Sequence, residues 1–210
     1  MNPHQVTAEF EKEIARYTGA PYCVCLDNCS NALFLALVYD DVSGKEISVP
    51  CRTYMSVPCE ILHAGGKVVF YKPPFYDGRT LTGAYQLSPS NVVDSSLRFT
   101  SDMYVAGTYM CCSFTGPYKH LKLGKGGAIL TDNEDAYKWF KKARFSGRNE
   151  VSYHEDTFDM TGWNFYMNPV IAELGLLLMQ QFYNLDGSRR KMPDITLPYP
   201  DLSTFPIYQK

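Results

Sequence analysis

The sequence lacks the features that mark a secreted, metal-binding or membrane-spanning protein. Its seven cysteines, an odd number, include no C-x-x-C pair, so neither a disulfide framework nor a zinc site is indicated. No basic-then-apolar leader opens the chain, and no apolar run approaches the roughly 18–20 residues that cross a bilayer. We therefore expect reduced, mostly buried thiols, no bound metal, no membrane contact and a cytoplasmic location.

An excess of charge of either sign is also lacking. The 210 residues carry 20 lysines and arginines against 22 aspartates and glutamates, and the basic residues form no stripe. A polyanion-binding surface needs such a stripe, so we expect no nucleic-acid partner. What the chain does have is 45% hydrophobic and 14% aromatic residues. This content excludes a disordered chain and predicts a buried core, in one large domain or two small ones.

Short apolar runs alternate with helical patterns along the chain. Val6, Phe10 and Ile14 recur every four residues, which predicts a helix over residues 6–17 that Gly19 ends. Strands are expected over residues 22–26, 47–50, 68–71, 92–94, 109–114 and 128–131. Further helices are expected over residues 31–39, 53–64, 133–145, with Asn133 as its cap, and 168–183. Such alternation predicts an α/β protein with a largely parallel sheet.

Two segments show no regular pattern. Residues 72–91 are interrupted by prolines and glycines, and we expect a loop or a reduced connection there. The last stretch, residues 193–210, carries four prolines and no periodicity. We expect it to be an extended tail that lies on the body of the protein or on a partner.

Polar residues follow several predicted strands, which is where parallel α/β sheets bind ligands. Residues 28–30 lie between a strand and a helix, and their backbone amides either hold a phosphate or simply cap the helix. Asp94 ends a strand and is either a site carboxylate or another cap. Lys119 opens a loop that is closed by glycines within residues 124–127, and it either binds a ligand or is exposed.

Taken in chain order, these segments resemble the DegT/DnrJ/StrS-type sugar aminotransferases, which are pyridoxal-phosphate enzymes with the aspartate aminotransferase fold. The resemblance extends from about residue 10 to about residue 182. It is carried by residues 10–19 (FEKEIARYTG), 28–37 (NCSNALFLAL), 49–65, 119–127 and 162–167 (GWNFYM). It implies a three-layer α/β domain over residues 1–186 with a mostly parallel sheet, followed by an extended tail over residues 187–210.

The resemblance also implies roles in pyridoxal 5′-phosphate chemistry for individual residues. Lys119 is expected to form the Schiff base and to move a proton, Asp94 to face the pyridine nitrogen, and Tyr54 to stack on the ring. The expected phosphate ligands are the backbone amides of Cys29 and Ser30, the hydroxyl of Ser113, and Asn164 from a second subunit. A site completed by a second subunit makes a homodimer the smallest functional unit.

The implied reaction moves an amino group from an amino acid, glutamate in the family, to a keto group of a nucleotide-linked sugar. The expected partners are therefore these two small molecules and a second copy of the chain. Two alternatives stay open. One is a pyridoxal-phosphate enzyme with another substrate or reaction, such as decarboxylation or modification of a nucleobase derivative. The other is an aminotransferase-like subunit that does not catalyse.

The chain departs from the family pattern at several positions. Leu97 replaces the usual Gln, Lys125 the usual Glu between the closing glycines, and Tyr166 the usual Arg. One extra residue separates Ser113 from Lys119, and the connection over residues 72–91 is shorter than in the family. The C-terminal small domain of the family is expected to be largely absent. The resemblance therefore supports cofactor binding more strongly than substrate recognition.

Overall fold

The computed structural model describes residues 3–73 and 80–208. The helices are α1 (Pro3–Thr18), α2 (Cys29–Tyr39), α3 (Ser56–His63), α4 (Glu134–Ala143) and α5 (Pro169–Met179). The strands are β1 (Tyr22–Leu26), β2 (Glu46–Pro50), β3 (Lys67–Tyr71), β4 (Thr80–Gln86), β5 (Val92–Leu97), β6 (Tyr109–Ser113), β7 (Gly127–Thr131) and β8 (Thr196–Pro198). The 3₁₀ turns are η1 (Tyr153–Glu155), η2 (Gln180–Phe182), η3 (Leu202–Thr204) and η4 (Pro206–Tyr208). None of these described helices is both long and apolar enough to cross a bilayer.

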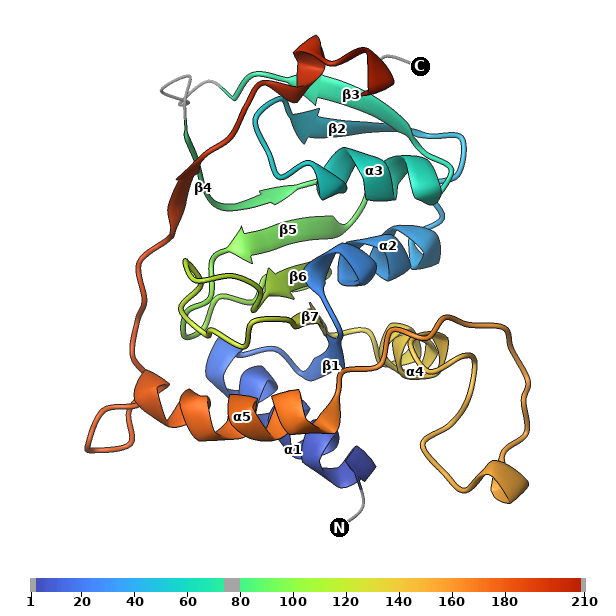
Figure 1. Ribbon diagram of the computed structural model, residues 1–210, viewed down its shortest axis with the longest axis vertical. Coiled ribbons are helices and arrows are strands. Elements are labelled where there is room, and N and C mark those ends of the chain that lie inside the picture. The colour runs from blue at the N-terminus through green and yellow to red at the C-terminus, as the bar shows by residue number, and fades with distance from the viewer. Residues whose placement is uncertain (1–2, 74–79, 209–210) are drawn as a thin grey trace.

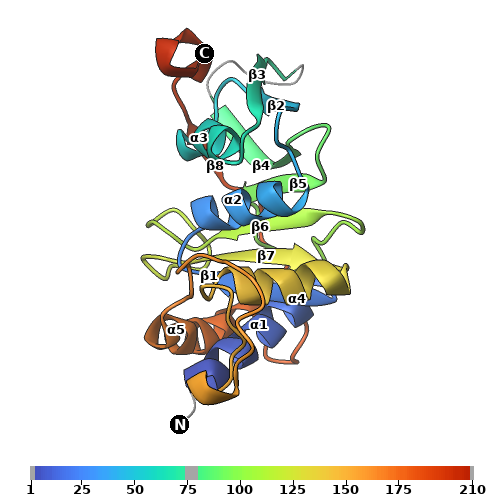
Figure 2. The same ribbon diagram turned by 90° about the vertical axis from the view of Figure 1, so that its right-hand side faces the viewer.

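Helices cover both faces of the central sheet (Figures 1 and 2). Because successive side chains of a strand point to opposite faces of the sheet, each central strand contributes side chains to two separate hydrophobic cores. In β1, Val24 and Leu26 pack in the core that α2, α3 and α4 cover. Cys23 and Cys25 pack in the core that α1 and α5 cover. This arrangement confirms the predicted α/β class with three layers.

The prediction of a mostly parallel sheet needs correcting. The strand order of the six-stranded sheet is β1-β7-β6-β5-β4-β8, and within it only β5 and β6 pair in parallel. Two of the antiparallel pairs are formed by strands that follow one another directly along the chain, with no helix between them. The loop over residues 114–126 leads from β6 to its antiparallel neighbour β7, and residues 87–91 lead from β4 to β5.

A smaller unit extends the fold beyond β4 and β5. Strands β2 and β3 form a parallel pair, and α3 lies in the connection between them, as is usual for parallel strands. Ser48 of β2 donates its backbone N–H to the carbonyl oxygen of Ser88, 2.7 Å away, in the turn between β4 and β5. The β2 strand ends just before the segment that carries Tyr54.

Most predicted elements are present, with ends shifted by a few residues. The cap at Asn133 is confirmed, since its side chain accepts the backbone N–H of Ala136 at the start of α4. Asn28 caps α2 in the same way by accepting the N–H of Asn31. The helix predicted over residues 53–64 begins only at Ser56, which leaves Tyr54 in the preceding loop. The last helix ends at Met179 and continues as the 3₁₀ turn η2.

The segment predicted to be irregular contains a strand that the sequence did not indicate. Strand β4 pairs with β5 on one side and with β8 on the other, while residues 74–79 lie outside the described residues. Gly83 interrupts the pattern of β4, has a φ of 71° and lies where the register shifts. A glycine inside a short strand is a bulge signal as well as a loop signal, which explains why the segment was read as a loop.

Candidate active site

A cavity of about 890 Å³ opens at the carboxyl ends of β5 and β6, beside the start of α2. Its wall is formed by the first turn of α2, the loop that carries Tyr54, the end of β5, the loop after β6, and residues 197–199 of the C-terminal segment. Figure 1 shows the arrowheads of β5 and β6 and the C-terminal segment on the same side of the sheet. The volume is in the range that holds a cofactor together with a small substrate.

One end of the cavity is built to bind an anion. The first turn of α2 presents the backbone N–H groups of Cys29 and Ser30, and the positive end of the helix dipole points the same way. The hydroxyl of Ser30 donates to that of Ser56, 2.7 Å away, and Ser113 also lines the cavity. Gly127 lets β7 approach the turn, because a Cβ there would lie 2.5 Å from the backbone nitrogen of Cys29.

Asp94 lies on β5 in the wall of the cavity and is only 1% exposed. Its carboxylate accepts the hydroxyl of Tyr85 at 2.6 Å and the backbone N–H of Ser96 at 2.8 Å. Tyr85 is in turn 2.5 Å from the hydroxyl of Thr53. Burial, followed by the neighbouring Asp94, raises the pKa of Tyr85 far above its ordinary value, so the phenol keeps its proton and stays a donor. These contacts fix the direction of the carboxylate.

Replacing Tyr85 by Phe removes one donor from this buried carboxylate. We expect the Tyr85→Phe variant to lose about 1.5–3 kcal/mol of unfolding free energy, as is usual for a hydrogen bond to a charged group. The matched control is Tyr17→Phe, because the hydroxyl of Tyr17 donates to a neutral acceptor, the carbonyl oxygen of Arg190, at 2.8 Å. We expect a smaller loss there. Urea unfolding measures both, and equal losses would contradict the role given to Tyr85.

Lys119 lies in the loop after β6 and points into the same cavity. Its Nζ donates to the carbonyl oxygen of Ser96 at 2.5 Å, two residues beyond Asp94. Burial lowers the pKa of Lys119, and the neighbouring Cys29, Asp94 and Cys112 only partly oppose this shift. A lowered pKa raises the fraction of neutral amine, which is the nucleophilic form.

The lowered pKa predicts the pH at which Lys119 becomes reactive. In competitive acetylation with acetic anhydride, we expect the half-maximal reactivity of Lys119 at a lower pH than that of Lys138. Lys138 is the control because its hydrogen bond to the exposed Glu134 raises its pKa. Mass spectrometry of peptides labelled at a series of pH values gives both midpoints. Midpoints that coincide or lie in the reverse order would show that burial does not control the Lys119 amine.

The structure brings the other predicted residues to the cavity, with one exception. Tyr54 lines the cavity, is 51% exposed and meets the ring of Tyr199 edge-on, with 6.3 Å between ring centroids. Asn164 lies outside the cavity and is exposed. The backbone next to Asn164 contacts the turn before α2, since the carbonyl oxygen of Phe165 accepts the N–H of Asp27 at 2.9 Å. The roles of these residues toward a cofactor remain predictions.

The positions that depart from the family pattern have local structural roles. Leu97 is buried, and its carbonyl oxygen accepts the N–H of Ile195 at 2.8 Å. Lys125 lines the cavity and lies 3.6 Å from a carboxylate oxygen of Asp27. Tyr166 places its ring 4.7 Å from the guanidinium of Arg144.

Two features of the site are not indicated by the sequence: the contact of Tyr85 with Asp94, and the part of the cavity wall that the C-terminal segment forms. Tyr85 lies in β4, the strand that was read as a loop, so nothing placed its hydroxyl near Asp94. Leu197, Pro198 and Tyr199 belong to the proline-containing tail, which carries no periodic signal. The one available signal is that an edge strand has unpaired backbone groups, so β5 needs a neighbour, which is β4, and β4 in turn needs β8.

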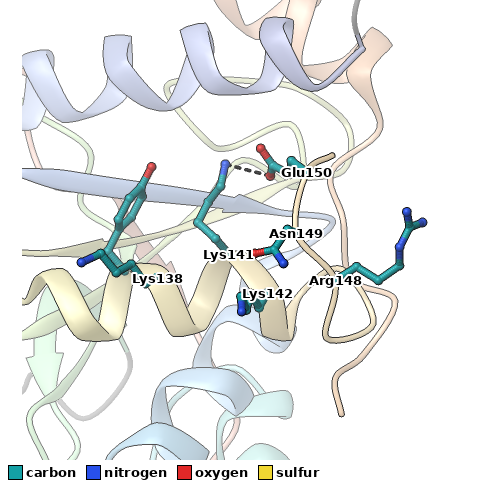
Figure 3. A pocket seen from close by; sticks show the side chains of 7 residues that line it. Lys138, Lys141, Lys142, Arg148, Asn149 and Glu150 are labelled. Carbon is teal, nitrogen blue, oxygen red and sulfur yellow. Dashed lines mark ion pairs between the residues drawn. The ribbon is translucent and has the colours of Figure 1, made fainter. Parts of the chain in front are cut away.

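A second cavity, of about 420 Å³, lies beside α4 and is lined by several basic side chains (Figure 3). Each of its four cations is ion-paired; the pairs are Lys138–Glu134, Lys141–Glu150, Lys142–Asp159 and Arg148–Asp156. A site for an anionic ligand needs unpaired positive charge, so this cavity is not a candidate. No group of acidic, Cys or His side chains able to hold a metal ion occurs in the described ranges.

Comparison with known proteins decides the family. A model of the DegT/DnrJ/EryC1/StrS aminotransferase family matches residues 3–74 and 105–196, well over half of the chain. The chain belongs to this aminotransferase family. The match includes Lys119, Tyr54 and Asn164 but leaves out the segment that contains β4, Tyr85 and Asp94. That segment is also where the chain was predicted to be shorter than its family.

Two curated relatives share between a fifth and a third of the aligned residues with this chain. It is 21% identical over 230 residues to GDP-perosamine synthase of Escherichia coli O157:H7, covering 89% of this chain and 61% of that protein. It is 28% identical over 102 residues to the dTDP-3-amino-3,6-dideoxy-alpha-D-galactopyranose transaminase of Aneurinibacillus thermoaerophilus, covering 48% of this chain and 26% of that protein.

Solved structures share the fold. The PLP form of the putative sugar aminotransferase Spr1654 from Streptococcus pneumoniae gives a TM-score of 0.64 at 19% identity, covering 84% of this chain and 59% of that chain. The apo form of the same protein gives a TM-score of 0.66 at 18% identity. The chain thus spans less than two thirds of the length of the relatives it matches. These similarities establish the aspartate-aminotransferase-like architecture of the large domain.

Proposed function

We propose that this chain is a pyridoxal-phosphate-dependent aminotransferase that acts on a nucleotide-linked sugar. The observation that carries the proposal is the meeting of three features in one cavity. They are the anion-binding start of α2, the buried carboxylate of Asp94, and Lys119 with its lowered pKa. Family membership supports the same reading.

The residues present fit the cofactor. A phosphate fits the N–H groups of Cys29 and Ser30, with the hydroxyl of Ser113 nearby. Asp94 offers a fixed carboxylate to a protonated ring nitrogen, and Tyr54 offers an exposed aromatic face. The solved PLP form of a structural neighbour is in keeping with this assignment.

The cofactor, when bound, supplies an aldehyde that takes up amino groups and a ring that withdraws electrons from the neighbouring carbon. The chain supplies the remaining chemistry. Lys119 would hold the cofactor through its neutral amine, and when that amine is free it would move a proton at the reacting carbon. Asp94, held in place by Tyr85 and Ser96, would stabilise positive charge on the ring.

We propose further that two copies of the chain complete each site. Asn164 lies outside the cavity of its own chain, although it is the residue that the resemblance assigns to a cofactor phosphate. Asn164 can have the implied role if it binds the cofactor of a second subunit. In a two-fold dimer, each subunit would supply its Asn164 to the site of the other. The proposed substrates are an amino acid, glutamate by resemblance, and a keto group on a sugar linked to a nucleotide. The relatives named for GDP- and dTDP-linked sugars support this class.

The test is a half-reaction with the purified protein and added pyridoxal phosphate. Incubation with glutamate should release 2-oxoglutarate in an amount equal to the sites filled, because no acceptor is present to return the cofactor to its starting form. Adding a nucleotide-linked keto sugar should then allow continued turnover. Binding of the cofactor without release of the corresponding 2-oxo acid from any tested amino acid would contradict transamination and favour another reaction of the same cofactor.

A further inference from the structure

Part of the C-terminal segment lines the cavity of its own chain. After α5 it runs along the side of the sheet where β5 and β6 end, and it reaches the region of β2 and β3 (Figure 1). On the way it adds β8 to the free edge of β4, with Leu197 opposite Leu81 in antiparallel register. The segment from residue 193 to residue 204 is referred to below as the strap.

The first end of the strap is tied to the loops that follow Asp94 and Lys119. Arg98 donates two hydrogen bonds to the carboxylate of Asp194, at 2.8 and 2.6 Å. The N–H of Ile195 donates to the carbonyl oxygen of Leu97, and a ring nitrogen of His120 is 2.7 Å from the carbonyl oxygen of Pro193.

The ion pair between Arg98 and Asp194 lies directly against Gly83 of β4. A Cβ on Gly83 would lie 2.3 Å from a carboxylate oxygen of Asp194 and 2.8 Å from the guanidinium of Arg98. Gly83 also has a positive φ of 71°, which disfavours a side chain independently. Gly83, at the register shift of β4, therefore leaves the space that the Arg98–Asp194 ion pair of the strap occupies.

The second end of the strap is tied to the loop that carries Tyr54. Arg52 donates to the carbonyl oxygen of Tyr199 at 2.9 Å, and the N–H of Leu202 donates to the carbonyl oxygen of Cys51 at 2.7 Å. The side chain of Leu202 is buried. Both ends of the strap are thus held by residues next to the proposed catalytic and cofactor-binding side chains.

Between these two ends the strap faces the cavity. Leu197, Pro198 and Tyr199 line it, yet about 890 Å³ stays open with the strap in place. A segment that filled the site would leave no such volume, so the strap is a wall of the site and does not plug it.

Tyr199 is the strap residue with the chemistry to recognise a substrate. Its ring is edge-on to Tyr54 at 67°, on the side of the cavity that Tyr54 borders. Burial, followed by the nearby Asp94 and Tyr54, raises the pKa of Tyr199 to about 12, so the phenol is neutral at physiological pH. It therefore offers an aromatic face and a hydroxyl that can donate or accept, as sugar and nucleobase rings require.

We propose that the strap forms the substrate-side wall of the site in its own chain, and that Tyr199 contacts the nucleotide-linked sugar there. The proposal rests on the proposed function for its substrate class. It assigns the recognition of the acceptor to Tyr199, which lies beyond residue 196, where the family match ends.

The test measures binding of two nucleotide-linked sugars without a keto group, GDP-mannose and dTDP-glucose, by titration calorimetry on the cofactor-loaded protein. We expect Tyr199→Ala to weaken the better-bound probe about tenfold, as loss of a buried aromatic contact does. Tyr199→Phe should keep most of the affinity through its ring. Phe205→Ala is the matched control, since Phe205 lies just beyond the strap, is 46% exposed and does not line the cavity.

Hydrogen exchange provides a second readout that needs no variant. Binding of the probe to the wild-type protein should slow amide exchange in the peptide that contains residues 195–204. Equal affinities of the wild type and Tyr199→Ala, an equal loss in Phe205→Ala, or no binding of either probe to the wild type would overturn the proposal. Failure of the proposed function is read separately, as the absence of cofactor attached to Lys119 in the wild-type protein.

Discussion

Replacing Lys119 by Ala is expected to abolish covalent attachment of pyridoxal phosphate. It should also lower amino-group transfer by at least about 10³-fold, since one amine both attacks the cofactor and moves the proton, and general acid–base catalysis alone contributes roughly 10²–10⁴-fold. The side chain is held at the cavity wall by the carbonyl oxygen of Ser96, and burial lowers its pKa.

Lys125 is the matched control for Lys119. It lines the same cavity, but its side chain is 66% exposed and lies near the carboxylate of Asp27. We expect Lys125→Ala to keep the cofactor attached, with at most a modest change in affinity. Visible absorbance and intact-protein mass after borohydride reduction measure attachment in both variants. Attachment that survives in Lys119→Ala and disappears in Lys125→Ala would reassign the reactive amine.

Replacing Arg144 by Met is expected to destabilise the fold by about 3–5 kcal/mol, the usual result of removing one member of a buried ionic network. Arg144 is fully buried, and its guanidinium donates to the carboxylate of Glu11, the carbonyl oxygen of Cys25 and the carboxylate of Glu150. Burial alone would lower the pKa of Arg144, but Glu11 and Glu150 together raise it. The network joins α1, β1 and the end of α4.

The cost arises from what the substitution leaves behind. Glu11 is 4% exposed and would keep Lys141 as a partner at 3.0 Å, while Glu150 would keep Lys141 at 2.8 Å (Figure 3). One cation would then face two carboxylates, which disfavours the folded state. Because the network lies apart from the residues that line the large cavity, we expect the change to act on stability without altering which lysine binds the cofactor.

Lys142→Met is the control for this prediction. Lys142 is paired with Asp159 at 2.7 Å, and the carboxylate side is 54% exposed. Such pairs contribute about 0–1 kcal/mol. Urea unfolding of the two variants against the wild type measures the difference. A loss in Arg144→Met no larger than the loss in Lys142→Met would show that the buried network does not stabilise the fold.

The sequence predicts the site where local order and chemistry coincide. Cys29 and Ser30 were found because a strand, a polar turn and an apolar helix follow one another, and that order alone places backbone N–H groups at a helix start. Asp94 was indicated by its place at the end of a predicted strand and Lys119 by its place in a loop that glycines close, and the strands β5 and β6 that precede these loops are neighbours. The structure places all four residues in one cavity, as these local signals indicated.

Pairing across the sheet could not be predicted in the same way. Strand β7 lies between β1 and β6 and is antiparallel to both, and it follows the long loop over residues 114–126. The length of a loop does not specify which strand the next one will pair with. Likewise, β4 and β8 have weak patterns of their own and are strands because each satisfies the backbone groups of the other. The pairing of β4 with β5 places Tyr85 beside Asp94, and the pairing of β8 with β4 brings the segment that carries Tyr199 to the cavity, so the sequence indicates neither role.

The account depends most directly on Lys119 as the amine that binds the cofactor. The measurement is the near-visible absorbance of the purified protein with added pyridoxal phosphate, followed by borohydride reduction and peptide mapping. We predict an absorbance band that disappears on reduction and a pyridoxyl label confined to Lys119. Absence of the band, or a label spread over surface amines such as Lys138 and Lys142, would contradict the account and favour an aminotransferase-like subunit without catalytic activity.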